Sequence, residues 1–130
     1  MNSNDELTTI LVVDDELYFL EILHIYALKK GYNVIIENSP DVAYERAIYV
    51  EPDLILSDYM MSKMNGLEFC KKIRNHPKLK DCLFIIMTNK PISKEVEAEF
   101  HNLPDGWISK TVGIKEMFNK IDKWLKIKKS

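Results

Sequence analysis

The sequence has few cysteines and no long apolar run. It carries 2 cysteines in 130 residues, Cys70 and Cys82, which are too few for a disulfide framework and fit a reducing compartment. The first residues are polar and acidic, so we expect no signal peptide, and no apolar stretch reaches the length that spans a membrane. These absences predict a soluble cytoplasmic protein without a membrane partner.

An excess of one charge sign is also absent. Lys and Arg number 18, Asp and Glu number 20, and the net charge is −2. A chain without a broad basic field is not expected to bind nucleic acid directly. The 4 glycines form neither a dinucleotide-binding fingerprint nor a P-loop, and the 3 histidines lack metal-ligand spacing. Nucleotide and flavin cofactors and a histidine-bound metal are therefore disfavoured.

The remaining composition is that of an ordinary globular domain, with 46% hydrophobic and 29% charged residues. Short apolar runs alternate with helical patterns, which predicts five βα units around a parallel sheet covered on both faces. The predicted strands span residues 8–13, 34–37, 54–58, 83–88 and 107–109. The first, third and fourth are nearly all apolar and should be central, so the other two should lie at the edges. We expect residues 1–7 to be flexible, 8–127 to form the domain and 128–130 to be a tail.

One face of the first predicted helix is apolar, and Gly31 would end this helix. The members of that face are Phe19, Ile22, Leu23, Tyr26 and Ala27. A second stripe lies beside it. It is either ordinary exposed surface or a contact with a neighbouring helix, or else a docking surface for a kinase or phosphotransfer helix. The members of the second stripe are Leu17, Leu20, His24 and Leu28.

Sequence signals also mark the other four helices. Ser39 is a predicted N-cap with Pro40 at the first helical position, and this helix must end before the next proline. A third helix spans residues 67–74, and Ser93 would cap a fourth that runs to about Phe100. The inner stripe of the last helix consists of Met117, Ile121, Trp124 and Leu125.

Polar side chains follow four of the predicted strands. Asp14 and Asp15 come after the first strand and Asp58 ends the third, so three carboxylates should meet at the edge of the sheet where ligands bind. Each Asp alone could merely cap a turn, but three together repel one another unless a cation such as Mg²⁺ compensates. Thr88 ends the fourth strand and adds a hydroxyl, and Lys110 follows the fifth strand and adds a positive charge. The set suits transfer of a phosphoryl group to a carboxylate.

These residues belong to longer motifs. The segment LVVDDE ends at Glu16, the segment from Asp58 to Gly66 reads DYMMSKMNG, and Thr88, Trp107 and Lys110 follow in order. In motif, order and spacing the chain resembles the receiver domain of two-component response regulators, whose simplest members are single-domain chemotaxis response regulators. The resemblance extends from about Thr9 to Leu125. It implies a doubly wound, flavodoxin-like α/β fold with strand order 2-1-3-4-5.

The resemblance also implies a phosphoryl chemistry. Asp58 would accept a phosphoryl group from the phosphohistidine of a sensor histidine kinase or histidine phosphotransfer protein. Asp15, Asp58 and the main-chain carbonyl of Met60 would hold Mg²⁺, and Asp14 would act through a water. Lys110 would contact the phosphoryl oxygens.

Signalling would follow from a switch, which the resemblance assigns to Thr88 and Trp107. Thr88 would also contact the phosphoryl oxygens, and its movement with Trp107 would change a protein-interaction face. The chain would then be a signalling switch in a phosphorelay and not an enzyme beyond its own phosphotransfer and autodephosphorylation. Its downstream protein target stays unknown, and it would be a monomer or a phosphorylation-dependent dimer.

Three positions depart from the family pattern. Ser62 and Thr111 stand where the family usually has proline, and Trp107 replaces the common Tyr or Phe. Because a cis bond before a residue other than proline costs about 2.5 to 4 kcal/mol, we expect the Lys110–Thr111 bond to be trans. Two other interpretations stay open: a receiver-like interaction module that does not use phosphate, and a metal-dependent hydrolase with an Asp nucleophile.

Overall fold

The fold is built on a sheet of five parallel strands in the order β2-β1-β3-β4-β5. This computed structural model describes residues 7–91, 93–99 and 103–129. The strands are β1 (Thr9–Val13), β2 (Asn33–Glu37), β3 (Leu54–Asp58), β4 (Leu83–Thr88) and β5 (Gly106–Ser109). The predicted strand order is confirmed, and the predicted bounds differ by at most one residue. The three most apolar strands are central because both of their faces are covered.

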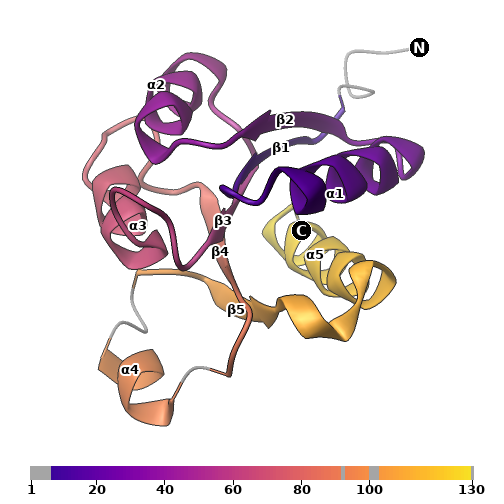
Figure 1. Cartoon of the computed structure of the whole chain (residues 1–130). Helices are drawn as coiled ribbons and strands as arrows, with labels where there is room; N and C mark the ends of the chain where they lie inside the picture. Colours follow the sequence, from indigo (N-terminus) through magenta and orange to yellow (C-terminus); the bar gives the residue numbers. More distant parts are fainter. Residues whose placement is uncertain (1–6, 92, 100–102, 130) are drawn as a thin grey trace.

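Helices cover both faces of the sheet. They are α1 (Leu17–Lys29), α2 (Pro40–Val50), α3 (Gly66–Arg74), α4 (Lys94–Glu99) and α5 (Ile114–Lys129), with a short 3₁₀ turn, η2 (Lys110–Val112), before α5. Helices α1 and α5 lie on one side of the sheet, and α2, α3 and α4 lie on the other (Figure 1). The predicted end of the fourth helix at Phe100 lies outside the described residues.

Successive side chains of each central strand pack alternately into two separate hydrophobic cores, one on each face of the sheet. Ile10 and Val12 of β1 pack with α1 and α5, whereas Leu11 and Val13 pack with α2 and α3. This two-residue period is the geometry of an extended strand, so one strand serves both layers. The cores fix the carboxyl ends of the strands, where the polar residues lie.

The inner face of α1 differs from the predicted one. Leu20, predicted on the second stripe, is 1% exposed and belongs to the core, whereas Ile22, predicted in the core, is 40% exposed. Leu23 and Ala27 are buried as predicted, and Phe19 and Tyr26 pack at the margin of the core. The buried face is therefore turned toward Leu20, which a helix that is apolar on nearly every side permits.

The ends of the helices follow their local sequence. Gly31, with φ of 91°, ends α1 as predicted. Pro40 occupies the first turn of α2, but the side chain of Ser39 makes no capping hydrogen bond. Ser93 does cap α4, because its hydroxyl accepts a hydrogen bond of 3.2 Å from the backbone N–H of Val96.

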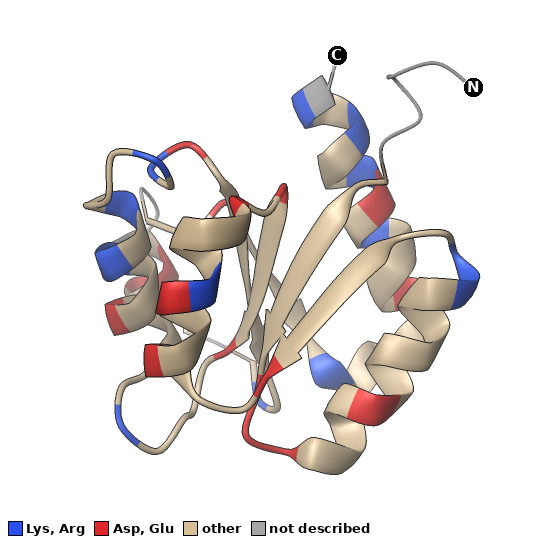
Figure 2. Ribbon diagram, turned by 90° about the horizontal axis from the view of Figure 1, so that it is seen from above, with Lys and Arg blue, Asp and Glu red and all other residues tan. Residues whose placement is uncertain are grey.

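Cys70 and Cys82 are buried free thiols. Among the described helices, none combines the length and apolarity needed to cross a bilayer. Positive and negative side chains are interspersed over the helices, and the loop from β1 to α1 is acidic (Figure 2).

Candidate functional site

Two buried carboxylates meet where β1 and β3 end. The register pairs Val13 with Ser57, so Asp14 and Asp58 leave the sheet side by side. Asp14 is 0% exposed and Asp58 is 3% exposed. Two carboxylates this deep in a protein must be compensated by positive charge or protonated.

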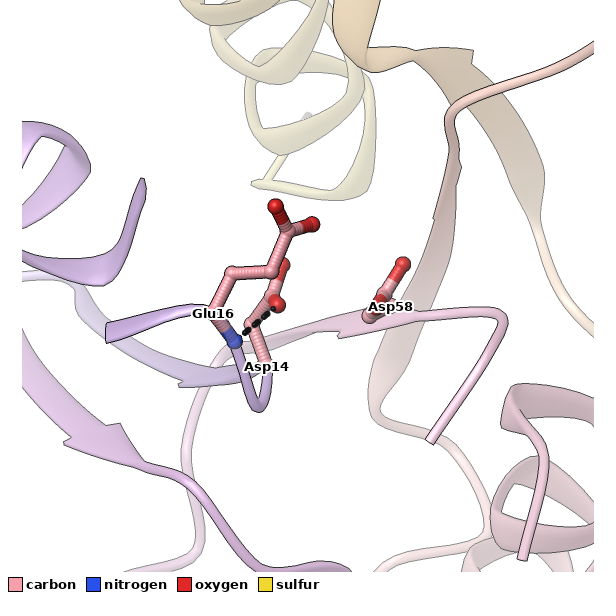
Figure 3. Close-up of side chains that lie close together, drawn as sticks. All are labelled: Asp14, Glu16 and Asp58. Carbon is pink, nitrogen blue, oxygen red and sulfur yellow. Dashed lines mark hydrogen bonds between the residues drawn. The ribbon is translucent and has the colours of Figure 1, made fainter. Parts of the chain in front are cut away.

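A third carboxylate in this cluster comes from Glu16. Side-chain oxygens of Asp14, Glu16 and Asp58 all lie within 4.8 Å of one another (Figure 3). The backbone N–H of Glu16 donates a hydrogen bond of 2.9 Å to Oδ1 of Asp14, which fixes the turn into α1 (Figure 3). Asp15 is exposed and does not belong to this group of three. Glu16 is the last residue of the LVVDDE motif, but its position in the sequence alone predicts no role for it.

Lys110 supplies the positive charge at this cluster. Its Nζ lies 2.6 Å from Oδ2 of Asp14, 2.8 Å from Oε1 of Glu16 and 3.2 Å from Oδ1 of Asp58. The lysine side chain is only 5% exposed, and its ammonium lies 4.6 Å from the centre of the Phe19 ring. Lys110 thus neutralises part of the acidic cluster, as its place after β5 predicts.

The backbone after β5 positions Lys110 at the start of η2. The Lys110–Thr111 peptide bond is trans, as predicted. The hydroxyl of Ser109 accepts a hydrogen bond of 3.2 Å from the backbone N–H of Thr111, and this contact caps the turn.

The ionisation of the cluster reflects burial and mutual repulsion. Burial and, to a smaller extent, the negative charge of Asp14 raise the pKa of Asp58, Lys110 opposes both effects, and the net pKa is about 6. Burial also raises the pKa of Asp14. The hydrogen bond from Lys110 lowers the pKa of the more exposed Glu16. Burial alone would lower the pKa of Lys110, but its acidic neighbours raise it, so the ammonium stays charged.

A glycine allows the loop after β3 to close against the site. A Cβ atom on Gly66 would lie 2.7 Å from the backbone oxygen of Asp58, so a side chain there would force the loop apart. Asn65 and Glu68 form a reciprocal capping box that starts α3 at this point. The Asn-Gly pair of the sequence motif therefore fixes the chain directly beside Asp58.

A cavity of about 340 Å³ opens beside Asp58. Its walls are Asp58, Tyr59, Met60, Thr88, Asn89, Lys90 and Pro91. Thr88 is 6% exposed at the end of β4, and Met60 is 70% exposed. The cavity is large enough for a phosphate-sized group and has the predicted hydroxyl in its wall.

Trp107, the predicted switch partner, lies on β5 and is half-buried against the core beneath α2 and α3. Its ring centre is 6.1 Å from that of Tyr59, which follows Asp58. The indole therefore packs against the loop that carries the cavity wall.

The donor set at the strand ends fits a hard divalent cation. Oδ2 of Asp14 is buried, and the Lys110 ammonium that lies 2.6 Å from it also faces the carboxylates of Glu16 and Asp58. One positive charge does not balance three carboxylates, and a divalent cation would supply the missing charge. Thr88, Lys110, Asp14 and Asp58 come together as predicted, and the ligand role of Asp15 and of the Met60 carbonyl stays a prediction.

Comparison with known proteins gives one consistent result. The family model described as response regulator receiver domain matches residues 10–122. Response regulator ArlR of Staphylococcus epidermidis is 30% identical over 115 residues, which are 88% of this chain and 51% of ArlR. The chain therefore spans about half the length of this relative.

Solved structures agree on the fold. Chemotaxis response regulator CheY4 of Vibrio cholerae superposes with a TM-score of 0.84 at 24% identity, over 91% of this chain and 98% of CheY4. Response regulator TrrA of Thermotoga maritima, in complex with Mg²⁺-BeF, gives a TM-score of 0.77 at 26% identity over 90% and 98% of the two chains.

Proposed function

The chain belongs to the response regulator receiver domain family, and from this premise we propose that it is a phosphoacceptor switch in which Asp58 takes the phosphoryl group. The observation that carries the proposal is the surroundings of Asp58. This buried carboxylate faces the Lys110 ammonium at 3.2 Å and borders a cavity that also contains Thr88. A nucleophile and a hydroxyl donor that border one cavity, with a cation in contact with the nucleophile, are what phosphoryl transfer requires.

The transfer exchanges one bond to phosphorus for another. An oxygen of ionised Asp58 attacks the phosphorus of a phosphohistidine, the P–N bond breaks, and the imidazole leaves with the electron pair. The charge spreads over three phosphoryl oxygens, which Lys110 and Thr88 are positioned to stabilise. The donor would be a sensor histidine kinase or a histidine phosphotransfer protein.

A divalent cation, Mg²⁺ by preference, completes the proposed site. Asp15, Asp58 and the carbonyl of Met60 would hold it, and Asp14 would assist through a water. When bound, the ion would neutralise charge on the carboxylates and the phosphoryl group. TrrA, a protein of similar fold, is known in complex with Mg²⁺-BeF, and this complex supports the proposal for the present chain.

We propose that the phosphoryl group acts by population shift. It would favour one arrangement of Thr88, the loop after it and Trp107, and so change the surface formed by α4, β5 and α5. The contact of Trp107 with Tyr59 supports such coupling, because it links β5 to the loop that follows Asp58.

The biological setting is also a proposal. We expect a cytoplasmic signalling switch that is a monomer or a phosphorylation-dependent dimer and acts on a protein target. Direct contact with nucleic acid or a membrane is not expected for this domain.

The test is incubation with Mg²⁺ and acetyl phosphate, followed by intact-mass measurement. One phosphoryl group should be added to the wild type and to Asp41→Asn, an exposed control on α2, and none to Asp58→Asn. Equal labelling of Asp58→Asn would refute the assignment. A wild type that takes no label would favour the interaction module, and steady turnover of a free phosphoester would favour the hydrolase.

A further inference from the structure

The carboxylate of Glu16 is the part of the acidic cluster to which the proposed function gives no role. Glu16 occupies the N-cap position of α1, yet its side chain makes no capping hydrogen bond. Its backbone N–H is already bonded to Asp14. The side chain is 54% exposed and is directed away from its own helix, toward the cluster (Figure 3).

Glu16 connects the loops that follow three different strands. It lies after β1, and its Oε1 accepts a hydrogen bond of 2.8 Å from Nζ of Lys110, which follows β5. The side chain of Asn89, which follows β4, lies close enough to contribute to the lowered pKa of the same carboxylate. The carboxylate thus bridges segments that are 94 residues apart in the chain, directly above the candidate site.

The ammonium of Lys110 has three N–H donors and three acidic neighbours. Asp14 and Asp58 are the neighbours that a divalent cation would also approach. A cation there would repel the ammonium, because two positive charges would compete for the same oxygens. Glu16 is the acidic neighbour of Lys110 that lies outside the expected ligand set.

The lysine needs such an anchor when a cation competes for Asp14 and Asp58, which otherwise hold its tip. Its stem is long and flexible, and the ammonium is a compact charge that water solvates well. The ammonium also lies 4.6 Å from the centre of the Phe19 ring, a weaker contact than an ion pair. Without Glu16, repulsion from the cation would favour an ammonium turned toward solvent.

We propose that Glu16 is a positioning residue for Lys110: it keeps the ammonium at the pocket when a cation occupies the site beside Asp58, with Asp14 joined to it through a water. The lysine retains one hydrogen bond to Glu16 and directs its other N–H donors toward the phosphoryl oxygens. This inference rests on the proposed phosphoacceptor function and adds one residue to its machinery.

The first test measures the rate of labelling by acetyl phosphate at saturating Mg²⁺. Glu16→Gln should be about fivefold slower than the wild type, a modest factor because the ion pair is half-exposed. Glu21→Gln, an exposed residue on the same helix, makes the same charge change and should keep the wild-type rate. In a Lys110→Met background, Glu16→Gln should cause no further loss.

The second test observes Lys110 itself, without phosphate. Proteins labelled with ¹³C at lysine Cε are compared by NMR with and without Mg²⁺, and Lys110→Met identifies the signal. In the wild type and in Glu21→Gln the Lys110 signal should stay distinct from those of solvent-exposed lysines after Mg²⁺ is added. In Glu16→Gln it should move to the position of the exposed lysines.

The outcomes separate this inference from the proposed function. If the wild type is labelled, but Glu16→Gln keeps the wild-type rate or the wild-type Lys110 signal with Mg²⁺, the positioning role is wrong and the phosphoacceptor function stands. An equal loss in the Lys110→Met background would also overturn the role. If the wild type takes no label at all, the proposed function fails first.

Discussion

Replacing Asp58 with Asn should make the cation-free protein more stable near neutral pH. Burial, with the charge of Asp14, raises the pKa of Asp58 from its ordinary 3.8 to about 6, so the ionised carboxylate costs the folded state about 3 kcal/mol. This cost already includes the opposing effect of Lys110, and asparagine keeps the shape of the side chain while it removes the charge. We therefore expect the free energy of unfolding to rise by about 1 to 3 kcal/mol.

The gain should depend on pH in one direction. Because the pKa of Asp58 is higher in the folded than in the unfolded protein, its carboxyl group stabilises the wild type below pH 3.8, and this contribution is lost as pH rises through about 6. The advantage of Asp58→Asn should therefore be full near neutral pH, shrink as pH falls through about 6, and be nearly absent at about pH 4.

Urea unfolding in EDTA, followed by tryptophan fluorescence, measures this difference at each pH. Asp41→Asn, which neutralises an exposed carboxylate on α2, is the matched control and should change the free energy of unfolding little. An Asp58→Asn protein that is less stable than the wild type near neutral pH would refute the reasoning. So would a gain of equal size at every pH.

Three further changes test other parts of the site and fold. Asp15→Ala should weaken Mg²⁺ binding more than Asp14→Ala in a metal titration; the reverse order would make buried Asp14 the direct ligand. Met60→Asn should speed loss of the phosphoryl group, because Met60 offers no group to orient a water and shields the cavity; a phosphate-release assay with an unchanged rate would contradict this. Gly106→Ala should destabilise the fold by about 1 to 3 kcal/mol in urea, because a Cβ atom there would overlap the Trp124 ring, and no loss of stability would contradict the packing.

The strands could be predicted closely from sequence because burial on both faces leaves a plain signal. The segment LILSD of β3, for example, begins and ends where predicted. The face of α1 could not be predicted as well. Leu20 and Ile22 are both apolar on a helix with apolar residues nearly all around, so the three-dimensional fit against β1 and α5, not the period, decides which one is buried.

The candidate site was also predictable from the sequence only in part. The positions of Asp58, Thr88 and Lys110 follow from their places after strands, because parallel strands end at one edge of the sheet. The contact of Glu16 with Lys110 does not, because it depends on how a side chain leaves a turn and on which rotamer reaches a partner 94 residues away. The sequence signal was the position of Glu16 inside the LVVDDE motif. The motif identifies the residue but does not predict which way its side chain points.

The strand order divides the site into two halves of unequal rigidity. Asp14, Asp58 and Thr88 follow or end β1, β3 and β4, whose backbone amides are hydrogen-bonded within the interior of the sheet and should be released only by large, cooperative openings. Lys110 follows β5, an edge strand with a neighbour on one side only. Local opening of this edge can therefore move the Lys110 ammonium without disturbing the carboxylates. Asp14 and Asp58 stay fixed by the interior of the sheet, whereas the position of Lys110 can adjust.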